Sequence, residues 1–336
     1  MTTASINQSS TDVDVVVIGG GAAGLNAAVT LGRARRSVVV IDSGAPRNAP
    51  ADGVHMFLTR DGIPPAELIG IGRREVAAYG GRFVDGEAVR AHRSGEMFTV
   101  TLADDRVITA RRLVVTTGLV DELPDVPGLR DLWGRDVHHC PYCHGWELDG
   151  RTVGVLGSGP MAVHQALMFR QWVPDLVLFQ HTAPDPTPEQ AEQLAALGVP
   201  VVVGRVDSLE VQDGHLAGVR MADGSVVPRQ SLVVAPRMVA RSQVLSSLGL
   251  TPSPHPLGLG EFIESDTTGS TGVPGVWVAG NVTNLSAGVI LAAADGMVAA
   301  IAANADLIVE DTAKAVAVYR ESGGAAATLE SMAASA

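Results

Sequence analysis

The stretch VDVVVIGGGAAG, residues 13–24, decides the fold of this chain. Its β-branched run predicts a strand, and the glycine-rich turn that follows without a gap leads into the helix-like LNAAVTLGRAR. A second β run, residues 37–42, ends at Asp42, where a carboxylate can accept a hydrogen bond from a ribose hydroxyl. The G-x-G-x-x-G positions are Gly19, Gly21 and Gly24. This order predicts a dinucleotide-binding unit, and a purely structural tight turn is the alternative.

A second unit of the same kind follows at residues 152–180. GSGPMA, residues 157–162, gives the G-x-G-x-x-A version of the turn between a strand and a helix. The sequence after its second strand, QHTAPDPTPEQ, offers neither an acid for the ribose of NAD nor arginines for the 2′-phosphate of NADP. Asp185 and Glu189 would repel that phosphate. We expect this unit to keep the fold without binding a nicotinamide nucleotide; the alternative is binding through contacts that the sequence does not reveal.

Strand-like alternation follows each unit. Residues 82–118 predict a β-meander joined to a returning strand, and residues 206–236 repeat a shorter version. The proline- and glycine-rich stretch 249–262 is expected to be a linker, after which GVWVAGN gives one more strand at 276–279 and then a long helix. The Ala-rich tail from about Ala313 shows only helix propensity. The predicted fold class is α/β, with two Rossmann-like, three-layer ββα nucleotide-binding domains that carry antiparallel inserts.

Composition narrows the partners and the location. A chain of 336 residues with 46% apolar content is long enough for two domains with their own cores. The net charge of −12 would repel both a nucleic-acid backbone and an anionic bilayer, so neither is an expected partner. The N-terminal MTTASINQSSTDVD lacks the features of a secretory signal, and no unbroken run approaches the ~18 apolar residues of a membrane span. We expect a cytoplasmic protein.

Both cysteines lie in HHCPYCHGWE, residues 138–147. The pair Cys140 and Cys143 fits three kinds of site: a zinc site, a structural disulfide or a dithiol that passes electrons. Structural disulfides are rare in the cytosol, and a structural zinc site normally shows a second ligand pair, which is not clear here. We therefore predict a redox dithiol and no metal.

The neighbouring residues suit thiol chemistry. The thiolate is the reactive form, so a working dithiol needs positive neighbours or a helix N-terminus. Pro141 favours the first turn of a helix, which would place a sulfur near unpaired N–H groups. Histidines that can supply positive charge or accept thiol protons are His138, His139 and His144.

In order and spacing, residues 13–305 resemble the low-molecular-weight thioredoxin reductase family. The similarity rests on GGGAAG, on TTG at 116–118, on the CxxC, on GSGPMA and on AGN at 279–281. The resemblance implies an FAD domain split in sequence by an inserted pyridine-nucleotide domain that carries the CxxC. The implied parts are residues 1–118, 119–250 and 251–336. The resemblance also implies a homodimer.

The same resemblance assigns residues to FAD. The glycine turn would hold the pyrophosphate, Asp42 the adenosine ribose, and the backbone near Gly288 and Val289 the negative charge of the reduced flavin. Asn281 replaces an acid of the family, which weakens one expected hydrogen bond to the cofactor. For His55 an exposed or capping role is the alternative. The full implied set is Gly19, Gly21, Ala22, Ala23, Gly24, Asp42, Ser43, Arg47, Asn48, His55, Thr117, Gly118, Gly280, Asn281, Gly288 and Val289.

Locally, CPYCHGWE is more similar to the dithiol oxidases of the gliotoxin and holomycin type. These resemble thioredoxin reductases, do not use NADPH, and close a disulfide in a small natural product with oxygen as final acceptor. The resemblance implies a role in antibiotic biosynthesis, a small-molecule dithiol substrate and hydrogen peroxide as by-product. In this scheme a substrate thiolate attacks Cys140, and Cys143 lies nearer the flavin. The implied catalytic residues are Cys140, Cys143, His144 and His139.

Two other functions stay open. The first is a thioredoxin-disulfide reductase that uses NADPH or another electron donor. The second is a flavoprotein scaffold or redox sensor whose dithiol reports oxidation to a partner. Tyr142 and Trp146 fit either a substrate pocket or the core.

Overall fold

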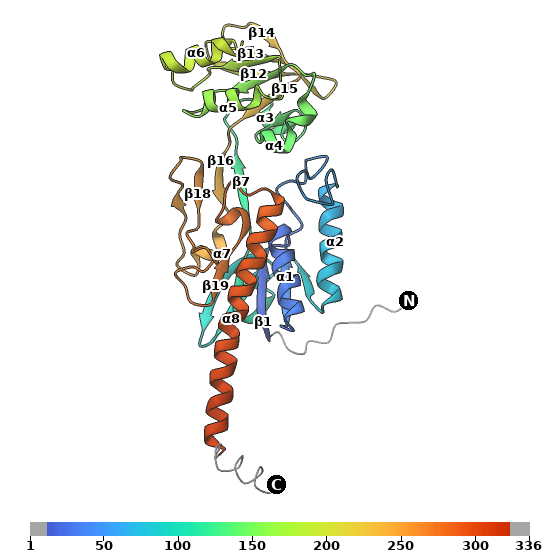
Figure 1. The fold of residues 1–336 in the computed structure, drawn as a ribbon, viewed down its shortest axis with the longest axis vertical. Helices are drawn as coiled ribbons and strands as arrows, with labels where there is room; N and C mark the ends of the chain where they lie inside the picture. The colour runs from blue at the N-terminus through green and yellow to red at the C-terminus, as the bar shows by residue number, and fades with distance from the viewer. Residues whose placement is uncertain (1–11, 323–336) are drawn as a thin grey trace, which may run out of the picture.

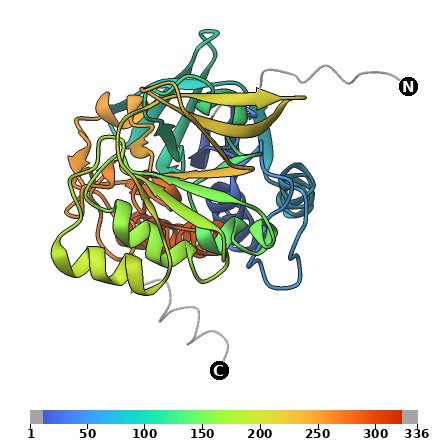
Figure 2. The same ribbon diagram turned by 90° about the horizontal axis from the view of Figure 1, so that it is seen from above.

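The computed structural model of the protein describes residues 12–322. They form two α/β units, one above the other, with a long C-terminal helix that projects beyond the lower unit (Figure 1). The view from above shows the upper unit lying over the lower one (Figure 2). The predicted α/β class is confirmed.

The motif that opened the sequence forms the centre of the lower unit. It comprises β1 (Asp12–Ile18), α1 (Ala22–Arg33) and β2 (Val38–Asp42), with β1 and β2 paired in parallel. Val15, Val16 and Val17 are completely buried. Helices cover such a parallel sheet on both faces, so an unbroken β-branched run specifies its central strand.

One segment differs from the expected meander. Residues Arg82–Asp85 form β3, which pairs in parallel with β2. The reason is helix α2 (Pro65–Ala78), which the sequence reading did not predict and which returns the chain to the starting end of the sheet. The antiparallel meander follows it, as β4 (Ala88–Ser94), β5 (Met97–Leu102) and β6 (Val107–Val115).

A strand from far along the chain completes this sheet. β19 (Val276–Val278) pairs in parallel with β6, which also pairs in parallel with β1. The strand order is β3-β2-β1-β6-β5-β4, with β19 on β6. The lower unit is therefore discontinuous in sequence, as predicted.

The upper unit contains the second glycine turn. Its parallel sheet has the order β11-β10-β9-β15-β8, and an antiparallel sheet β12-β13-β14 lies beside it as the predicted insert. The helices are α3 (Leu129–Leu132), α4 (Pro141–His144), α5 (Ala162–Phe169) and α6 (Pro188–Ala196), with the short 3-10 helix η1 (Trp146–Leu148). The strands are β8 (Val137–His138), β9 (Val153–Leu156), β10 (Leu176–Phe179), β11 (Val201–Val202), β12 (Val206–Gln212), β13 (His215–Met221), β14 (Val226–Pro228) and β15 (Ser231–Val234).

Two strands connect the units. β7 (Leu119–Glu122) and β16 (Arg237–Ala240) are antiparallel neighbours. The expected linker is more ordered than predicted, because β17 (Ser253–Pro254) and β18 (Gly260–Phe262) extend this sheet in the order β17-β18-β16-β7. Helix α7 (Gln243–Ser246) follows β16 and lies against β4 of the lower unit. The domain boundaries at residues 118 and 251 stay a prediction.

Helix α8 (Val289–Glu321) is long and apolar enough to cross a membrane by length and composition alone. Polar residues interrupt the helix, so its sequence contains no unbroken apolar run of the length that a membrane span requires. Its buried face packs on α1 through Ala292, Ala293, Gly296, Ala299, Ala300, Ala303 and Leu307. A β-carbon at Gly296 would lie 1.9 Å from the carbonyl oxygen of Ala23, so glycine allows the close crossing. We therefore assign the first half of α8 to the protein core.

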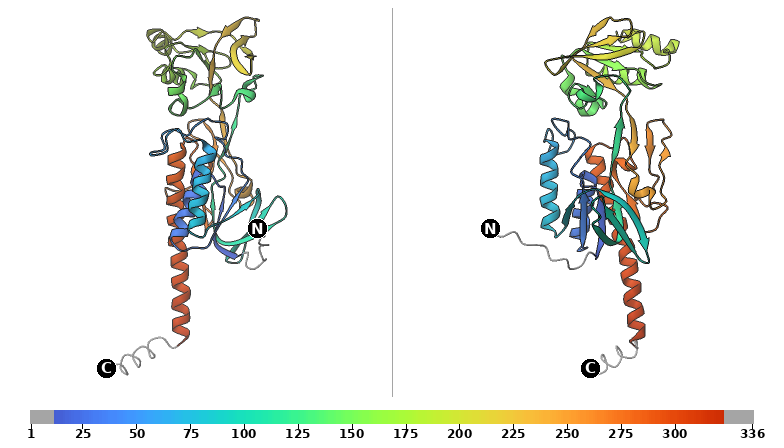
Figure 3. Two further views of the ribbon diagram at one scale, coloured as in Figure 1. Left: turned by 90° about the vertical axis from the view of Figure 1, so that its right-hand side faces the viewer. Right: turned by 180° about the vertical axis from the view of Figure 1, so that it is seen from behind.

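The later turns of α8 extend away from both units (Figure 3). Ion pairs tie them to the lower sheet: Glu310 accepts from Arg111 and Arg112 of β6 at 2.9 and 2.6 Å, and Asp311 accepts from Arg36 at 2.6 Å. These ion pairs therefore join the later turns of α8 to the lower unit. The part of the Ala-rich tail from residue 323 lies outside the described residues.

Candidate functional site

The glycine turn of the lower unit leaves the start of α1 open. Gly21 is the N-cap of α1 and no side chain caps it. A β-carbon at Gly21 would meet nothing within 4 Å, whereas one at Gly24 would lie 1.9 Å from the carbonyl oxygen of Gly19. Gly24 is thus required by the protein's own backbone, and Gly21 faces open space. Unpaired N–H groups at a helix start suit a pyrophosphate.

Asp42 lies at the end of β2, beside this turn. One carboxylate oxygen accepts the N–H of Gly20 at 3.1 Å, and the other lies 3.5 Å from the guanidinium of Arg73. Ser43 follows on the exposed loop. A part-exposed carboxylate at this place has the acceptor chemistry that a ribose hydroxyl requires.

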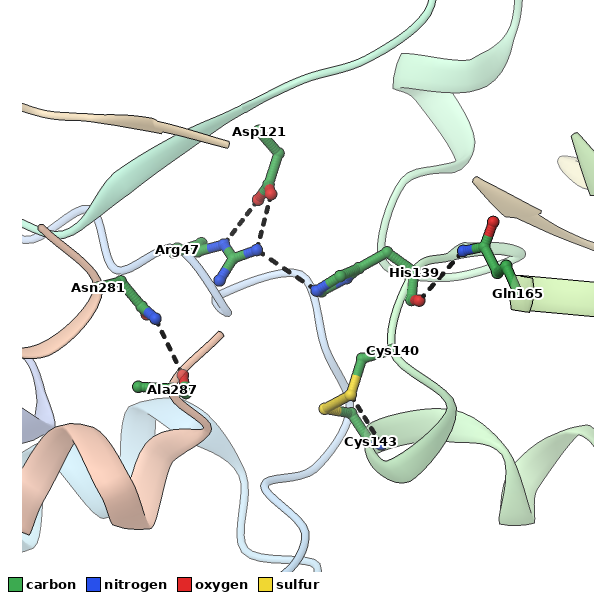
Figure 4. Close-up of a disulfide and its surroundings, with 8 residues drawn as sticks. All are labelled: Arg47, Asp121, His139, Cys140, Cys143, Gln165, Asn281 and Ala287. Atoms are coloured by element: carbon green, nitrogen blue, oxygen red, sulfur yellow. Dashed lines mark hydrogen bonds and ion pairs between the residues drawn. A yellow bond between two sulfur atoms is a disulfide. The ribbon is translucent and has the colours of Figure 1, made fainter. Parts of the chain in front are cut away.

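A second open helix start comes from α8, whose N-cap Gly288 also has no side-chain cap. The preceding turn, which includes the 3-10 helix η2 (Gly280–Val282), is shaped by Asn281. The amide nitrogen of Asn281 donates to the carbonyl oxygens of Asn284 and Leu285 at 3.0 and 3.4 Å. It also donates to the carbonyl oxygen of Ala287 at 2.9 Å (Figure 4). The donor end of the side chain thus holds its own turn, and the contact of Asn281 with the cofactor stays a prediction.

The residues therefore fit FAD. Two uncapped helix starts, an open backbone at Gly21 and a carboxylate at the ribose position together suit a dinucleotide. Some of the other residues expected at the cofactor serve the protein itself. Ala23 is buried, and the hydroxyl of Thr117 donates to the carbonyl of Arg241 at 2.7 Å, next to Gly118. A part in binding FAD stays a prediction for Ala22, Asn48, Gly280 and Val289.

The two cysteines are joined in a disulfide. Cys140 is the N-cap of α4, and its sulfur accepts the backbone N–H of Cys143 at 3.2 Å. Pro141 occupies the first turn, as the sequence predicted. This N–H stabilises negative charge on Cys140, which is the sulfur that the proposed thiol exchange requires as a leaving group.

The histidines around the disulfide are neutral at neutral pH, which differs from the expected positive charge. Burial lowers the pKa of His138 to about 3, and burial together with the cation of Arg47 lowers the pKa of His139 to about 4. Burial also lowers the pKa of His144, against the opposing effect of Glu147. The rings of His138 and His144 lie 4.6 Å apart. The α4 N–H is therefore the positive group next to the sulfur, and the imidazoles are available as proton acceptors.

The segment between β2 and α2 reaches the upper unit. Arg47 binds both carboxylate oxygens of Asp121 at 2.7 Å and points a nitrogen at His139, 3.4 Å away (Figure 4). The ring of His55 lies 3.4 Å from Glu147. Both residues contact groups near the cysteines, and their expected part in binding FAD stays a prediction. Sequence reasoning missed Asp121, because nothing in LVDE distinguishes it from a surface acid.

Two aromatic side chains beside the disulfide are exposed. Trp146 is 81% exposed and Tyr142 62% exposed, with Tyr142 edge-on to Trp172. Neither side chain belongs to the core, so that interpretation is wrong, and the role in a substrate pocket stays a prediction. Among residues 12–322, no group of three His, Cys, Asp or Glu side chains is placed to hold a metal ion.

The loop after the second glycine turn folds back onto Gly157, the first glycine of the turn. The N–H groups of Thr182 and Ala183 donate to the carbonyl of Gly157 at 3.0 and 2.9 Å. The amide of Gln180 donates to the carboxylate of Asp185. The position that a nucleotide ribose would occupy thus carries an amide already paired with an acid.

Comparisons with known proteins agree with this geometry. Residues 13–305 match the model of the family described as pyridine nucleotide-disulphide oxidoreductase. Thioredoxin reductase tcpT of Claviceps purpurea (strain 20.1) is 31% identical over 284 residues, covering 80% of this chain and 86% of that protein. Thioredoxin reductase aclD of Aspergillus oryzae (strain ATCC 42149 / RIB 40) is 29% identical, covering 90% of this chain and 98% of that protein. The crystal structure of HlmI has a TM-score of 0.87 at 46% identity, covering 94% of this chain and 99% of that chain.

These matches confirm the predicted resemblance to thioredoxin reductases and to the dithiol oxidases related to them, and they confirm FAD as the cofactor. They support a flavin-dependent thiol:disulfide oxidoreductase. Because the family model spans both units, from the first glycine turn into α8, the chain belongs to the pyridine nucleotide-disulphide oxidoreductase family.

Proposed function

We propose that this protein is a dithiol oxidase that closes a disulfide in a small molecule, with oxygen as final electron acceptor. The observation that carries the proposal lies in the second unit, where the position of a nucleotide ribose holds Gln180 already paired with Asp185. The cysteine disulfide is flanked by His138 and His139, whose lowered pKa values leave both rings neutral. Electrons can thus enter through the cysteines, and the usual entry through a nicotinamide lacks its binding residues.

Thiol–disulfide exchange is the chemistry of the cysteine pair. A substrate thiolate attacks the sulfur of Cys140, the Cys140–Cys143 bond breaks, and Cys143 leaves as a thiolate. The second substrate thiol, after losing its proton to an imidazole, attacks the substrate sulfur of the mixed disulfide. Cys140 then leaves as a thiolate stabilised by the N–H of Cys143, 3.2 Å away. The substrate has lost two protons and two electrons, and the cysteines hold the electrons as a dithiol.

Bound FAD would supply the two-electron acceptor that returns the cysteines to the disulfide, with oxygen then reduced to hydrogen peroxide. The protein's contribution is to hold that cofactor between the starts of α1 and α8. The exposed Trp146 and Tyr142 offer an apolar surface to the rest of a small substrate. A natural-product dithiol of the kind used in antibiotic biosynthesis fits this description.

The purified yellow protein tests the proposal when it is mixed anaerobically with either NADPH or a small dithiol. We expect the dithiol to bleach the flavin and NADPH to leave it oxidised, and we expect oxygen uptake with matching peroxide formation in air. Rapid bleaching by NADPH would overturn the proposal and favour a thioredoxin reductase, as tcpT and aclD are named. Loss of peroxide formation in Cys143→Ser would exclude the redox-sensor function.

We also propose a cytoplasmic homodimer. The outer face of α8 exposes Met297, Ile301 and Ile308, which are spaced by four and seven residues and so lie along one stripe of the helix. A second copy covering this stripe would remove apolar surface from water. Light scattering of the purified protein over a series of concentrations tests this proposal. We expect the mass of a dimer, and a monomer at all concentrations would contradict it.

A further inference from the structure

Arg47, Asp121 and His139 form one contact chain beside the disulfide. Asp121, on β7, has a side chain only 7% exposed, and both of its carboxylate oxygens accept from Arg47 at 2.7 Å. This bidentate pair fixes the plane of the guanidinium. A terminal nitrogen of the same guanidinium lies 3.4 Å from Nε2 of His139.

The chemistry of arginine determines which residue donates the hydrogen in the contact between Arg47 and His139. A guanidinium has donors only and keeps its charge at every working pH. For Arg47 to hydrogen-bond Nε2 of His139, that nitrogen must be the acceptor, so the ring proton lies on Nδ1. The ring is further held by stacking on Trp133, with ring centroids 5.7 Å apart.

The ring of His144 differs from that of His139 in its hydrogen bonds to neighbouring side chains. No side chain within residues 12–322 hydrogen-bonds its ring, and its Nδ1 has no partner there. It is four residues from Cys140 on the same short helix, and its backbone N–H donates to the carbonyl of Cys140 at 3.2 Å. Of the two histidines predicted to be catalytic, His144 therefore has a ring free to take a proton.

We propose that Arg47, aligned by Asp121, occupies the acceptor nitrogen of His139, so that His144 is the group that accepts the substrate thiol protons. Arg47 and Asp121 act as positioning residues. The proposal rests on the proposed thiol chemistry of the disulfide. It assigns His139 to orienting the turn that leads into the cysteines, where Gln165 also donates to its backbone carbonyl at 3.4 Å.

The charged groups around the two rings come from several elements. His139 faces Arg47 from the segment after β2, Asp121 from β7 and His144 from α4. His144 faces His138 of β8, His139, Glu147 of η1 and, from the segment after β2, His55 and Asp52. Removing Arg47 takes away the cation next to His139, which favours protonation of that ring.

Histidine nitrogen resonances test the proposal on the full-length FAD-loaded protein labelled with ¹⁵N-histidine. In the wild type we expect His139 in the Nδ1–H tautomer, with no titration between about pH 5 and pH 8. In Arg47→Met we expect the Nε2 resonance to shift, because this nitrogen loses its hydrogen-bond donor. Asp121→Asn keeps the volume of the side chain but loosens the guanidinium, so we expect it to shift the Nε2 resonance as well.

Arg237→Met is the matched control, because Arg237 pairs with Glu122, the residue next to Asp121, at 2.6 Å and has no contact with His139. It leaves the His139 resonances unchanged. A proton on Nε2 of His139 in the wild type would overturn the proposal without any variant. So would Arg47→Met with unchanged His139 resonances.

The pH dependence of peroxide formation gives a second readout. We expect His144→Gln to remove the ascending limb of the profile and to lower the rate by about 10²- to 10⁴-fold. A limb that survives in His144→Gln and disappears in His139→Gln would assign the base to His139 and overturn the proposal. Absence of dithiol oxidation in the wild type would instead contradict the proposed function, while the nitrogen resonances would still decide the role of Arg47.

Discussion

The amide nitrogen of Asn281 donates to the carbonyl oxygen of Ala287 at 2.9 Å, across the turn that leads into α8. Two further carbonyls, of Asn284 and Leu285, face the same nitrogen. Only a donor fits among three acceptors, and an aspartate has none when ionised. The position where the family carries an acid is therefore committed in this chain to placing the start of α8.

Asn281→Asp is expected to lower the free energy of unfolding by about 1–3 kcal/mol at neutral pH, because the three carbonyls lose their donor. A protonated carboxylic acid can donate, so the difference from the wild type should shrink as the pH falls toward about 4. Urea denaturation of both proteins at several pH values measures this. A constant difference across the pH range would contradict the hydrogen-bond explanation.

Gly21→Ala is expected to lower the affinity for FAD while leaving the stability of the FAD-free protein close to that of the wild type. The added methyl meets no protein atom within 4 Å but projects into the space assigned to the pyrophosphate. Flavin fluorescence titration and thermal unfolding of the stripped protein separate the two effects.

Gly159→Ala is the matched control, since Gly159 is the equivalent glycine of the second unit and its added methyl also meets nothing within 4 Å. It should change neither FAD affinity nor dithiol oxidation. A loss of activity in Gly159→Ala alone would indicate that the second unit binds something needed for turnover.

Glu310→Gln is expected to destabilise the protein by about 1–2 kcal/mol at pH 7, because a charged partner of two arginines is lost. Burial opposes ionisation of Glu310, but hydrogen bonds from Lys314, Arg112 and Arg111 outweigh it and lower its pKa from 4.5 to about 2. The folded-state pKa lies below the unfolded one, so this stabilisation is present above about pH 4.5 and is lost as the pH falls toward 2.

Denaturation midpoints of Glu310→Gln and wild type should therefore converge at acid pH. Glu96→Gln is the control, because Glu96 also pairs with Lys314 but is 75% exposed on the side chain. Its effect should stay within about 0.5 kcal/mol. An equal loss of stability in Glu310→Gln and Glu96→Gln would contradict the idea that the more buried acid contributes more to stability.

Cys140→Ser and Cys143→Ser should each abolish peroxide formation with a small dithiol and keep the flavin spectrum. Exchange needs a sulfur to attack and a sulfur to leave, and serine is neither at neutral pH. Oxygen uptake and the visible spectrum of the same samples provide the measurement. Residual turnover in both variants would mean that electrons reach the flavin without the cysteines.

Local patterns in the chain were sufficient for the two glycine turns, their flanking strands and the helix start at Pro141, because each depends on residues close together in sequence. Helix α2 escaped prediction, and β3 was assigned to the meander. A strand's neighbours depend on the crossover that precedes it, and the period-two pattern of Arg82–Asp85 fits either kind of pairing. The expected linker at 249–262 contains two short strands, which also depend on pairing partners distant in sequence.

The site divides in the same way. The identity of the cysteine pair, the glycines and Asp42 followed from spacing alone, since their chemistry is local. The contact of Arg47 with Asp121 and His139 joins residues 74 and 92 positions apart, and the neutrality of the histidines arises from burial that no spacing encodes. Packing of one unit against the other decided both, because desolvation and long-range ion pairs exist only once the chain has folded.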